Sequence, residues 1–358
     1  MQPNMNLSKP DQALTAILQH GAAMDAAIKD STSLGALAKE IEKIDQGKEM
    51  ASQLLPLDLS PAMVEYRDLL RLTLPERKLH LPWQPERSIS MVFGPRGIGK
   101  TWFELALATA YVTGQPFLKW PVNSPVGVLY VDGEMALDDL RSRATGLMRA
   151  TPQAPLHFLT SELVYHKFQR DLVLTSSTMR DAMTTILDAH PEIRVVILDN
   201  ISSLFSGLNE DKKQDWEPIN TWLIRLRHRG LAVILVHHAG KGGAQRGTSG
   251  REDALDTVIQ LDRPPDYDAK EGCHFELRFT KCRSVKGEDV GPLDVQLGER
   301  DGFLQWSFKD LEESKFDKAR RLFDEGVTSP TDLAEELAIT KGYASKMIRK
   351  IKAQQVAV

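Results

Sequence analysis

Cysteine is scarce in this chain, which has only two, Cys273 and Cys282, among 358 residues. Two cysteines cannot build the disulfide framework of a small secreted protein, so we expect a reducing, cytoplasmic environment. Long apolar runs are also missing, because none approaches the ~20 residues that a membrane-spanning helix needs. The polar start MQPNMNLSKPDQ lacks the pattern of a signal peptide. We therefore expect a soluble cytoplasmic protein without a membrane partner.

An excess of charge of either sign is missing too. Lys and Arg number 45 against 49 Asp and Glu, which gives a formal net charge of −4. This balance does not attract nucleic acid to the chain as a whole, so any such contact must come from local basic patches. The length exceeds one ordinary domain and favours a large domain with smaller accessory parts.

The spacing of apolar residues divides the chain into three expected domains. Residues 1–60 have helical spacing and no catalytic constellation. Residues 61–310 alternate amphipathic stretches with the apolar runs SISMVFG, VGVLYVDGE, VVILDN and LAVILVHH. Continuous Val, Ile and Leu runs separated by helices predict an α/β fold, in which helices flank a mostly parallel sheet. Residues 311–358 have the pattern of short helices.

The strongest motif is GPRGIGKT, which lies between the strand-like run SMVF and the helical pattern TWFELALATAYV. This is the context of a phosphate-binding P-loop, whose glycines let backbone N–H groups turn toward phosphate oxygens. Lys100 is expected to reach the β- and γ-phosphates, and Thr101 to place its hydroxyl on Mg²⁺. The motif therefore predicts ATP and Mg²⁺ as cofactors. Its residues are Gly94, Pro95, Arg96, Gly97, Ile98, Gly99, Lys100 and Thr101.

Polar residues follow three of the apolar runs. Asp199 follows the four apolar residues of VVILDN, where a carboxylate can hold Mg²⁺ or simply cap the next helix. Glu134 follows VLYVD, where it can accept a proton from an attacking water or be an ordinary solvated acid. LAVILVHH ends in two histidines, His237 and His238, on opposite strand faces, which suit a sensor or a structural role about equally.

The last part predicts a helix-turn-helix. Phe316, Ala319 and Leu322 have helical spacing, and SPTD supplies Ser329 as the cap of the next helix. The final helix carries basic residues on its outer side and no acidic residue, which suits the major groove of DNA or the phosphates beside it. Many such modules bind proteins or only cap a domain. The basic residues are Lys341, Lys346, Arg349 and Lys350.

The stretch LRFTKCRSVKG predicts a strand that changes character along its length. Because strand side chains alternate between faces, Phe275, Leu277 and Phe279 are expected to share a face with Lys281 and Arg283. That face would be apolar first and cationic at its end.

Five motifs, GPRGIGKT, VLYVDGEM, VVILDNISSLF, VILVHHAGKGGAQRGTSGREDALDTV and LRFTKCRSVKG, occur in this order within residues 85–305. Together they resemble the RecA-like P-loop ATPases of the plasmid RepA type, which are related to DnaB-like hexameric replicative helicases. The resemblance implies Glu134 as the general base, Asp199 as the Walker B acid and His238 as the γ-phosphate sensor, with His237 structural. It also implies that Lys281 and Arg283 reach the nucleotide of a neighbouring subunit.

The resemblance implies in addition that two loops, 206–215 and 240–252, face a central channel and contact single-stranded DNA. The second loop carries Lys241, Arg246 and Arg251 among glycines, and neither loop has an aromatic residue in its core to stack on a base. Any grip would therefore be mainly electrostatic. Glycine and charge also mark ordinary solvent-exposed loops.

Two functions remain open from the sequence. The first is a hexameric ATP-driven DNA motor, a replicative helicase of a plasmid, phage or other mobile element, with single-stranded DNA in its channel and duplex DNA on the C-terminal helices. The second is an ATP-switched DNA-binding regulator or loader that separates no strands. A small-molecule kinase fits poorly, because it has no use for the last motif or for a basic terminal helix.

Overall fold

The computed structural model describes residues 58–74, 76–208, 213–239, 254–264, 267–300, 303–311 and 315–356. Contacts divide the chain into two compact units, Met1–Pro75 and Glu76–Val358. In the first unit, the described residues form a short 3-10 turn, η1 (Ser60–Ala62), and one helical turn, α3 (Tyr66–Leu69). The expected domain boundaries near residues 60 and 310 stay predictions. Across the described ranges, no helix has both the length and the apolarity that crossing a bilayer requires.

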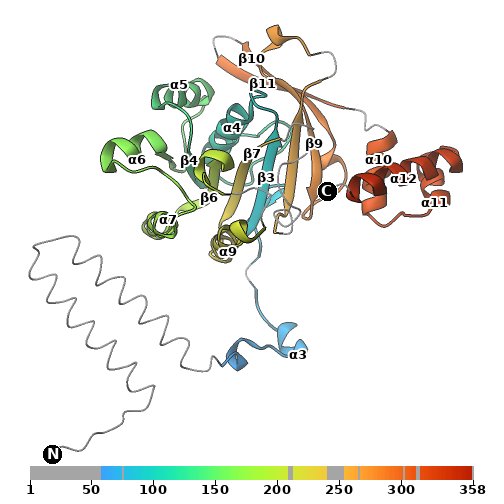
Figure 1. Ribbon diagram of the computed structural model, residues 1–358, viewed down its shortest axis with the longest axis horizontal. Coiled ribbons are helices and arrows are strands. Elements are labelled where there is room, and N and C mark those ends of the chain that lie inside the picture. Colours follow the sequence, from blue (N-terminus) through green and yellow to red (C-terminus); the bar gives the residue numbers. More distant parts are fainter. Residues whose placement is uncertain are drawn as a thin grey trace, which may run out of the picture. The chain divides into compact units, whose positions relative to one another are not determined.

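The second unit is built on one nine-stranded sheet with the order β11-β10-β9-β8-β3-β7-β6-β4-β5 (Figure 1). The six strands from β8 to β5 are parallel, whereas β9, β10 and β11 pair antiparallel at the other edge. The predicted mixed α/β fold with a mostly parallel sheet is confirmed. The strands are β3 (Ser88–Gly94), β4 (Gly127–Asp132), β5 (Leu156–Thr160), β6 (Ile193–Asp199), β7 (Ala232–His238), β8 (Thr257–Asp262), β9 (His274–Cys282), β10 (Leu293–Arg300) and β11 (Phe303–Asp310). A separate small sheet pairs β1 (Leu79–Leu81) with β2 (Gln84–Pro85).

Helices cover both faces of the sheet, which explains why its central strands are apolar at nearly every position. In β6, Val195 and Ile197 face one core, whereas Val196 and Leu198 face the other. The first core is closed by α4 (Lys100–Thr113) and α5 (Leu137–Leu147). The second is closed by α6 (Ser161–Phe168), α7 (Ser177–Ala189), α8 (Ile201–Leu204) and α9 (Lys213–His228).

Strand β9 contains a bulge that the sequence pattern did not predict. In the pairing with β8, Lys281 lies opposite Val258 and Phe279 lies opposite Ile259. Thr280 is therefore an extra residue on β9, with no residue opposite it on β8. The bulge shifts the alternation of faces by one residue, and Cys282 packs with Phe279 against the first core. The expectation that Lys281 continues the apolar face is therefore wrong, because strict alternation holds only for an unbroken ladder.

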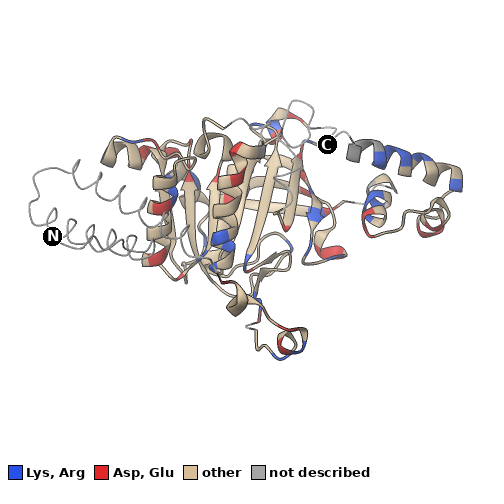
Figure 2. Cartoon of the chain, turned by 60° about the horizontal axis from the view of Figure 1, so that its bottom comes forward, with Lys and Arg blue, Asp and Glu red and all other residues tan. Residues whose placement is uncertain are grey.

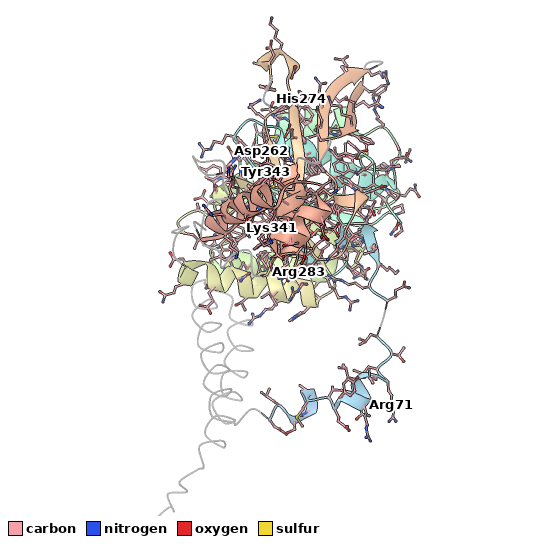
Figure 3. The ribbon with its side chains drawn as sticks, turned by 90° about the vertical axis from the view of Figure 1, so that its right-hand side faces the viewer. Arg71, Asp262, His274, Arg283, Lys341 and Tyr343 are labelled. Carbon is pink, nitrogen blue, oxygen red and sulfur yellow. The ribbon has the colours of Figure 1, made fainter. Side chains whose placement is uncertain are left out.

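Arg283 lies just beyond the last residue of β9. Its backbone N–H donates to the carbonyl of Asp256 at 3.0 Å, and its side chain is exposed. Figure 3 shows Arg283 at the opposite end of β9 from His274. An exposed guanidinium at the end of this strand was expected. Arg283 supplies it, but from the turn that follows the last paired residue of β9.

Three helices follow the sheet: α10 (Lys315–Asp324), α11 (Pro330–Glu336) and α12 (Lys341–Val356). They enclose a small core of their own that includes Ala319, Leu333 and Ile351. Ser329 caps α11 by accepting the Thr331 N–H at 3.2 Å, as its sequence predicts. Lys and Arg positions occur along α12 (Figure 2). All four predicted DNA contacts on it are exposed: Lys341, Lys346, Arg349 and Lys350. Their contact with DNA stays a prediction.

Candidate nucleotide site

The GPRGIGKT loop turns sharply between β3 and α4. Gly97 and Gly99 have φ of 71° and 112°, which ordinary side chains rarely adopt. A Cβ atom at Gly99 would also lie 2.1 Å from the Cys273 sulfur, so only glycine fits. Ile98 is buried in the first core and anchors the loop. The tight turn directs the first backbone N–H groups of α4 toward one place, which is how a P-loop binds an anion.

Lys100 is the first residue of α4, and its ammonium is buried against the loop. Nζ donates to the carbonyls of Gly94 and Pro95 at 2.9 and 2.8 Å. Burial lowers the pKa of Lys100 to about 8, although the charges of Asp199 and Glu134 act in the opposite direction. The loop thus holds a cation beside the N-terminus of α4, where both favour a phosphate.

Asp199, at the end of β6, meets Thr101 from α4. Its carboxylate accepts hydrogen bonds from the side chains of Thr101 and Tyr130, the latter at 2.7 Å. Burial raises the pKa of Asp199, and these two hydrogen bonds oppose that rise. A hydroxyl and a carboxylate in contact are the oxygen ligands that Mg²⁺ takes beside a P-loop.

Asp132, the last residue of β4, organises the turn that carries Glu134. Its Oδ1 accepts the backbone N–H groups of Glu134 and Met135 at 3.1 and 2.7 Å. Burial raises the pKa of Asp132 to about 6, while these hydrogen bonds act against the rise. No motif singled out this residue, although its place at the carboxyl end of an apolar run was a usable signal.

Asn200 holds the side chain of Glu134, and it was also missed. Its Nδ2 donates to Glu134 Oε2 at 2.5 Å. Its own Oδ1 accepts the N–H of Ser203 at 3.2 Å, so α8 fixes the amide. The carboxylate of Glu134 is therefore aimed by a residue that directly follows the Walker B position.

Replacing Asn200 by alanine should lower ATP turnover about 10-fold, because a misaimed general base loses much of its typical 10²–10⁴-fold contribution. Nucleotide affinity should hardly change, since Lys100 and the loop are untouched. Steady-state hydrolysis and binding of a fluorescent nucleotide measure the two effects. Ser202→Ala, at a neighbouring position of the same cavity, is the matched control. Unchanged turnover in Asn200→Ala would remove the positioning role.

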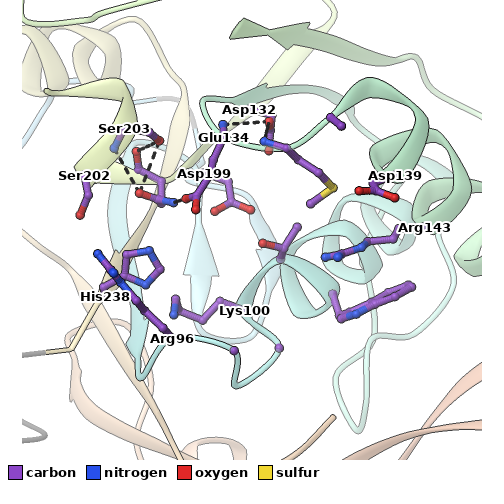
Figure 4. Close-up of a pocket in the computed structure, with 17 residues that line it drawn as sticks. Arg96, Lys100, Asp132, Glu134, Asp139, Arg143, Asp199, Ser202, Ser203 and His238 are labelled. Carbon is purple, nitrogen blue, oxygen red and sulfur yellow. Dashed lines mark hydrogen bonds between the residues drawn. The ribbon is translucent and has the colours of Figure 1, made fainter. Parts of the chain in front are cut away.

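These side chains surround one cavity of about 740 Å³ (Figure 4). Figure 4 shows Lys100, Glu134, Asp199 and His238 around the same space. His238 lines this cavity, whereas His237 is fully buried. The sensor role of His238 and the structural role of His237 stay predictions. The remaining P-loop residues that line it are Arg96, Gly97, Gly99 and Thr101.

The cavity extends past the loop to an aromatic wall that the motifs did not predict. Trp102 lies there with the guanidinium of Arg143 over its ring, 5.0 Å from the centroid. Asp139 of α5 lines the same end. Trp102 directly follows the P-loop motif, but Arg143 comes from a helix with no motif, so only the fold reveals the pair.

Lys281 and Arg283 are absent from this lining among the described residues. Lys281 instead lines a second cavity of about 650 Å³ beside α10. The first candidate channel loop, 206–215, is described only in part, with 209–212 outside the described residues. The second, 240–252, lies wholly outside them, together with Lys241, Arg246 and Arg251.

Residues 56–244 match the family model of an AAA domain, which is more than half of the 358-residue chain. The chain belongs to this AAA domain family. Its AAA domain contains the P-loop, Glu134, Asp199 and His238. No curated protein sequence matches the chain. Together with the geometry of the cavity, the family match identifies a P-loop ATPase.

The donor set of the AAA domain fits a nucleoside triphosphate and a divalent metal. The loop N–H groups and Lys100 would hold the phosphates, and Thr101 and Asp199 would hold the metal. A divalent metal held there would neutralise charge on the phosphates. Asn200 and the turn at Asp132 position the carboxylate of Glu134, whose role as general base stays a prediction.

Proposed function

We propose that this ATPase is a RepA-type RecA-like motor that works as a hexamer on DNA and separates strands as a replicative helicase of a plasmid, phage or other mobile element. The observation that carries the proposal is the placement of Lys281 and Arg283. Lys281 is near the end of β9 and Arg283 lies just beyond it, and neither lines the cavity of its own chain. Cations so placed suit a nucleotide held by a neighbouring subunit.

The chemistry assigned to each group follows from its position. Lys100 and the loop N–H groups bind the phosphates, and Glu134 accepts the proton of the attacking water. His238, at the end of β7 beside Gly94, is close enough to the loop to respond to the phosphates. Arg283 of a neighbouring subunit stabilises the charge that develops on the transferred group. Hydrolysis then depends on assembly.

DNA contact is assigned to two local basic regions. The loop 240–252 would follow the phosphate backbone of single-stranded DNA in a central channel. The exposed cations of α12 would contact duplex DNA. A chain of net charge −4 needs such local patches, because its overall field repels DNA.

The test is displacement of a labelled strand from forked DNA with ATP and Mg²⁺. We expect displacement by the wild-type protein, stimulation of hydrolysis by single-stranded DNA, and neither effect in Lys100→Ala. Hydrolysis stimulated by DNA without any displacement would contradict the helicase. In that case the second candidate stands, an ATP-switched DNA-binding regulator or loader, which the basic helix α12 favours. Footprinting of duplex DNA with and without ATP then tests it.

A further inference from the structure

Three potential metal ligands gather at the end of the sheet opposite the nucleotide site. His157 is on the edge strand β5, and His190 and Glu192 belong to the turn between α7 and β6. Because β4, β5 and β6 are parallel, these residues lie where the strands begin, whereas Asp132 and Asp199 lie where they end. Neither histidine takes part in the ATPase chemistry.

The ligand atoms have the spacing of a small coordination site. Glu192 Oε1 is 3.0 Å from His190 Nδ1 and 3.6 Å from His157 Nε2, and all three atoms lie within 4.8 Å of one another. Two ligands about 2.0–2.1 Å from a tetrahedral ion are about 3.3–3.4 Å apart. These two distances fall on either side of that value, and the third pair lies within 4.8 Å, so side-chain rotations would bring the three atoms around one ion.

The Nε2 atom of His157 lacks a hydrogen-bond partner. It is buried, and its distance of 3.6 Å to Glu192 is too long for a hydrogen bond. His274 shows the alternative, since its two nitrogens each pair with a carboxylate oxygen at 2.6 Å, from Glu271 and Asp294. His274 is thus a satisfied histidine, whereas His157 Nε2 lies 3.6 Å from the Glu192 carboxylate, at ion-pair distance but beyond hydrogen-bond range.

The three residues come together because the backbone around Glu192 lies very close to the start of β4. A Cβ atom at Gly127, the first residue of β4, would lie 2.6 Å from the carbonyl oxygen of Glu192. Glycine therefore lets the turn before β6 lie against the start of β4, and a pairing irregularity occurs at the same place. His157 on β5 is next to β4 on its other side. The cluster thus bridges β5 and β6 across β4.

We propose that His157, His190 and Glu192 bind one Zn²⁺, with a water molecule as fourth ligand. Two imidazoles and a carboxylate match the nitrogen and oxygen ligands of zinc and suit Mg²⁺ poorly. The ion links the edge strand β5 to the turn before β6. Because such an ion binds the folded chain, it stabilises this edge of the sheet independently of the nucleotide.

The experiment uses the full chain, stripped with a chelator and titrated with Zn²⁺ in excess Mg²⁺, which occupies the nucleotide site. We expect about one Zn²⁺ per chain by calorimetry and metal analysis, and a higher Tm with Zn²⁺. Co²⁺ should give the intense visible bands of a four-coordinate site. His157→Ala and His190→Ala should each weaken Zn²⁺ binding at least about 10-fold, as loss of a direct ligand exceeds the 10–100-fold cost of losing an outer one.

The matched control is His166→Ala. His166 also stands beside a glutamate, Glu162, at 3.7 Å, but among the described residues this pair has no third ligand. The control should bind Zn²⁺ like the wild type. ATP hydrolysis without Zn²⁺ reports whether each variant is folded. Absence of stoichiometric Zn²⁺ from the wild type, or equal Zn²⁺ affinity in the two His variants and the wild type, would overturn the proposal.

Discussion

Replacing Lys100 by alanine will reduce ATP hydrolysis by at least about 10²–10³-fold, the usual cost of removing one preorganised charge donor from a transition state. The Lys100 ammonium donates hydrogen bonds to two carbonyls of the P-loop. Because it is buried, little water screens its attraction to an anion that enters the cavity. Nucleotide binding should weaken as well, because Lys100 is expected to contact the phosphates both in the bound nucleotide and in the transition state. Phosphate release and equilibrium binding of a fluorescent nucleotide measure both losses.

Lys119→Ala is the matched control for Lys100. Its ammonium is also largely shielded, and it pairs with Asp310 at 2.7 Å and with the carbonyl of Glu288 at 2.8 Å. Lys119 does not line the nucleotide cavity. Its loss should leave hydrolysis unchanged. Full activity in Lys100→Ala, with an intact fold by circular dichroism, would show that the phosphates bind elsewhere.

Replacing Glu134 by glutamine will separate binding from hydrolysis. The amide keeps the shape of the side chain but cannot accept the proton of water, so turnover should fall about 10²–10⁴-fold. Affinity for ATP should stay within about threefold, since Lys100, Thr101 and Asp199 remain. A single-turnover assay with a parallel binding titration measures this difference. Asp139→Asn removes another acid of the same cavity and should retain activity.

The same variant tests whether Arg283 acts between subunits. Homogeneous assemblies of Arg283→Ala and of Glu134→Gln should both be inactive. Mixed assemblies contain interfaces that join an intact Glu134 on one subunit to an intact Arg283 on the next, so part of the activity should return. Activity that stays absent at every mixing ratio would argue that Arg283 does not act across the interface.

The local parts of the nucleotide site were predictable. GPRGIGKT carries its own turn, and the apolar runs before Asp199 and His238 place those residues at strand ends. Parallel strands bring such ends to one edge of a sheet, so the sequence was enough to gather Lys100, Asp199 and His238. The strand and helix pattern of the core followed from the same periodicity.

Contacts between segments without motifs were not predictable. Asn200 and Glu134 are 66 residues apart, and only their packing shows that one aims the other. The bulge at Thr280 was equally hidden, because the composition of a strand does not reveal where its ladder skips a residue. For this reason Lys281 was wrongly expected on the same face of the sheet as the apolar residues of β9.

By itself, the sequence determined a P-loop ATPase on a mostly parallel sheet, since phosphate binding and strand burial both depend on neighbouring residues in the chain. Only the tertiary structure decided which polar side chains lie close together: Asn200 donates to Glu134, and His157 lies 3.6 Å from Glu192 across β4. The physical reason is that hydrogen bonds and metal ligation act over about 2–3 Å. Sequence periodicity determines the face of a residue, but strand register and close backbone approaches such as Gly127 determine its neighbours.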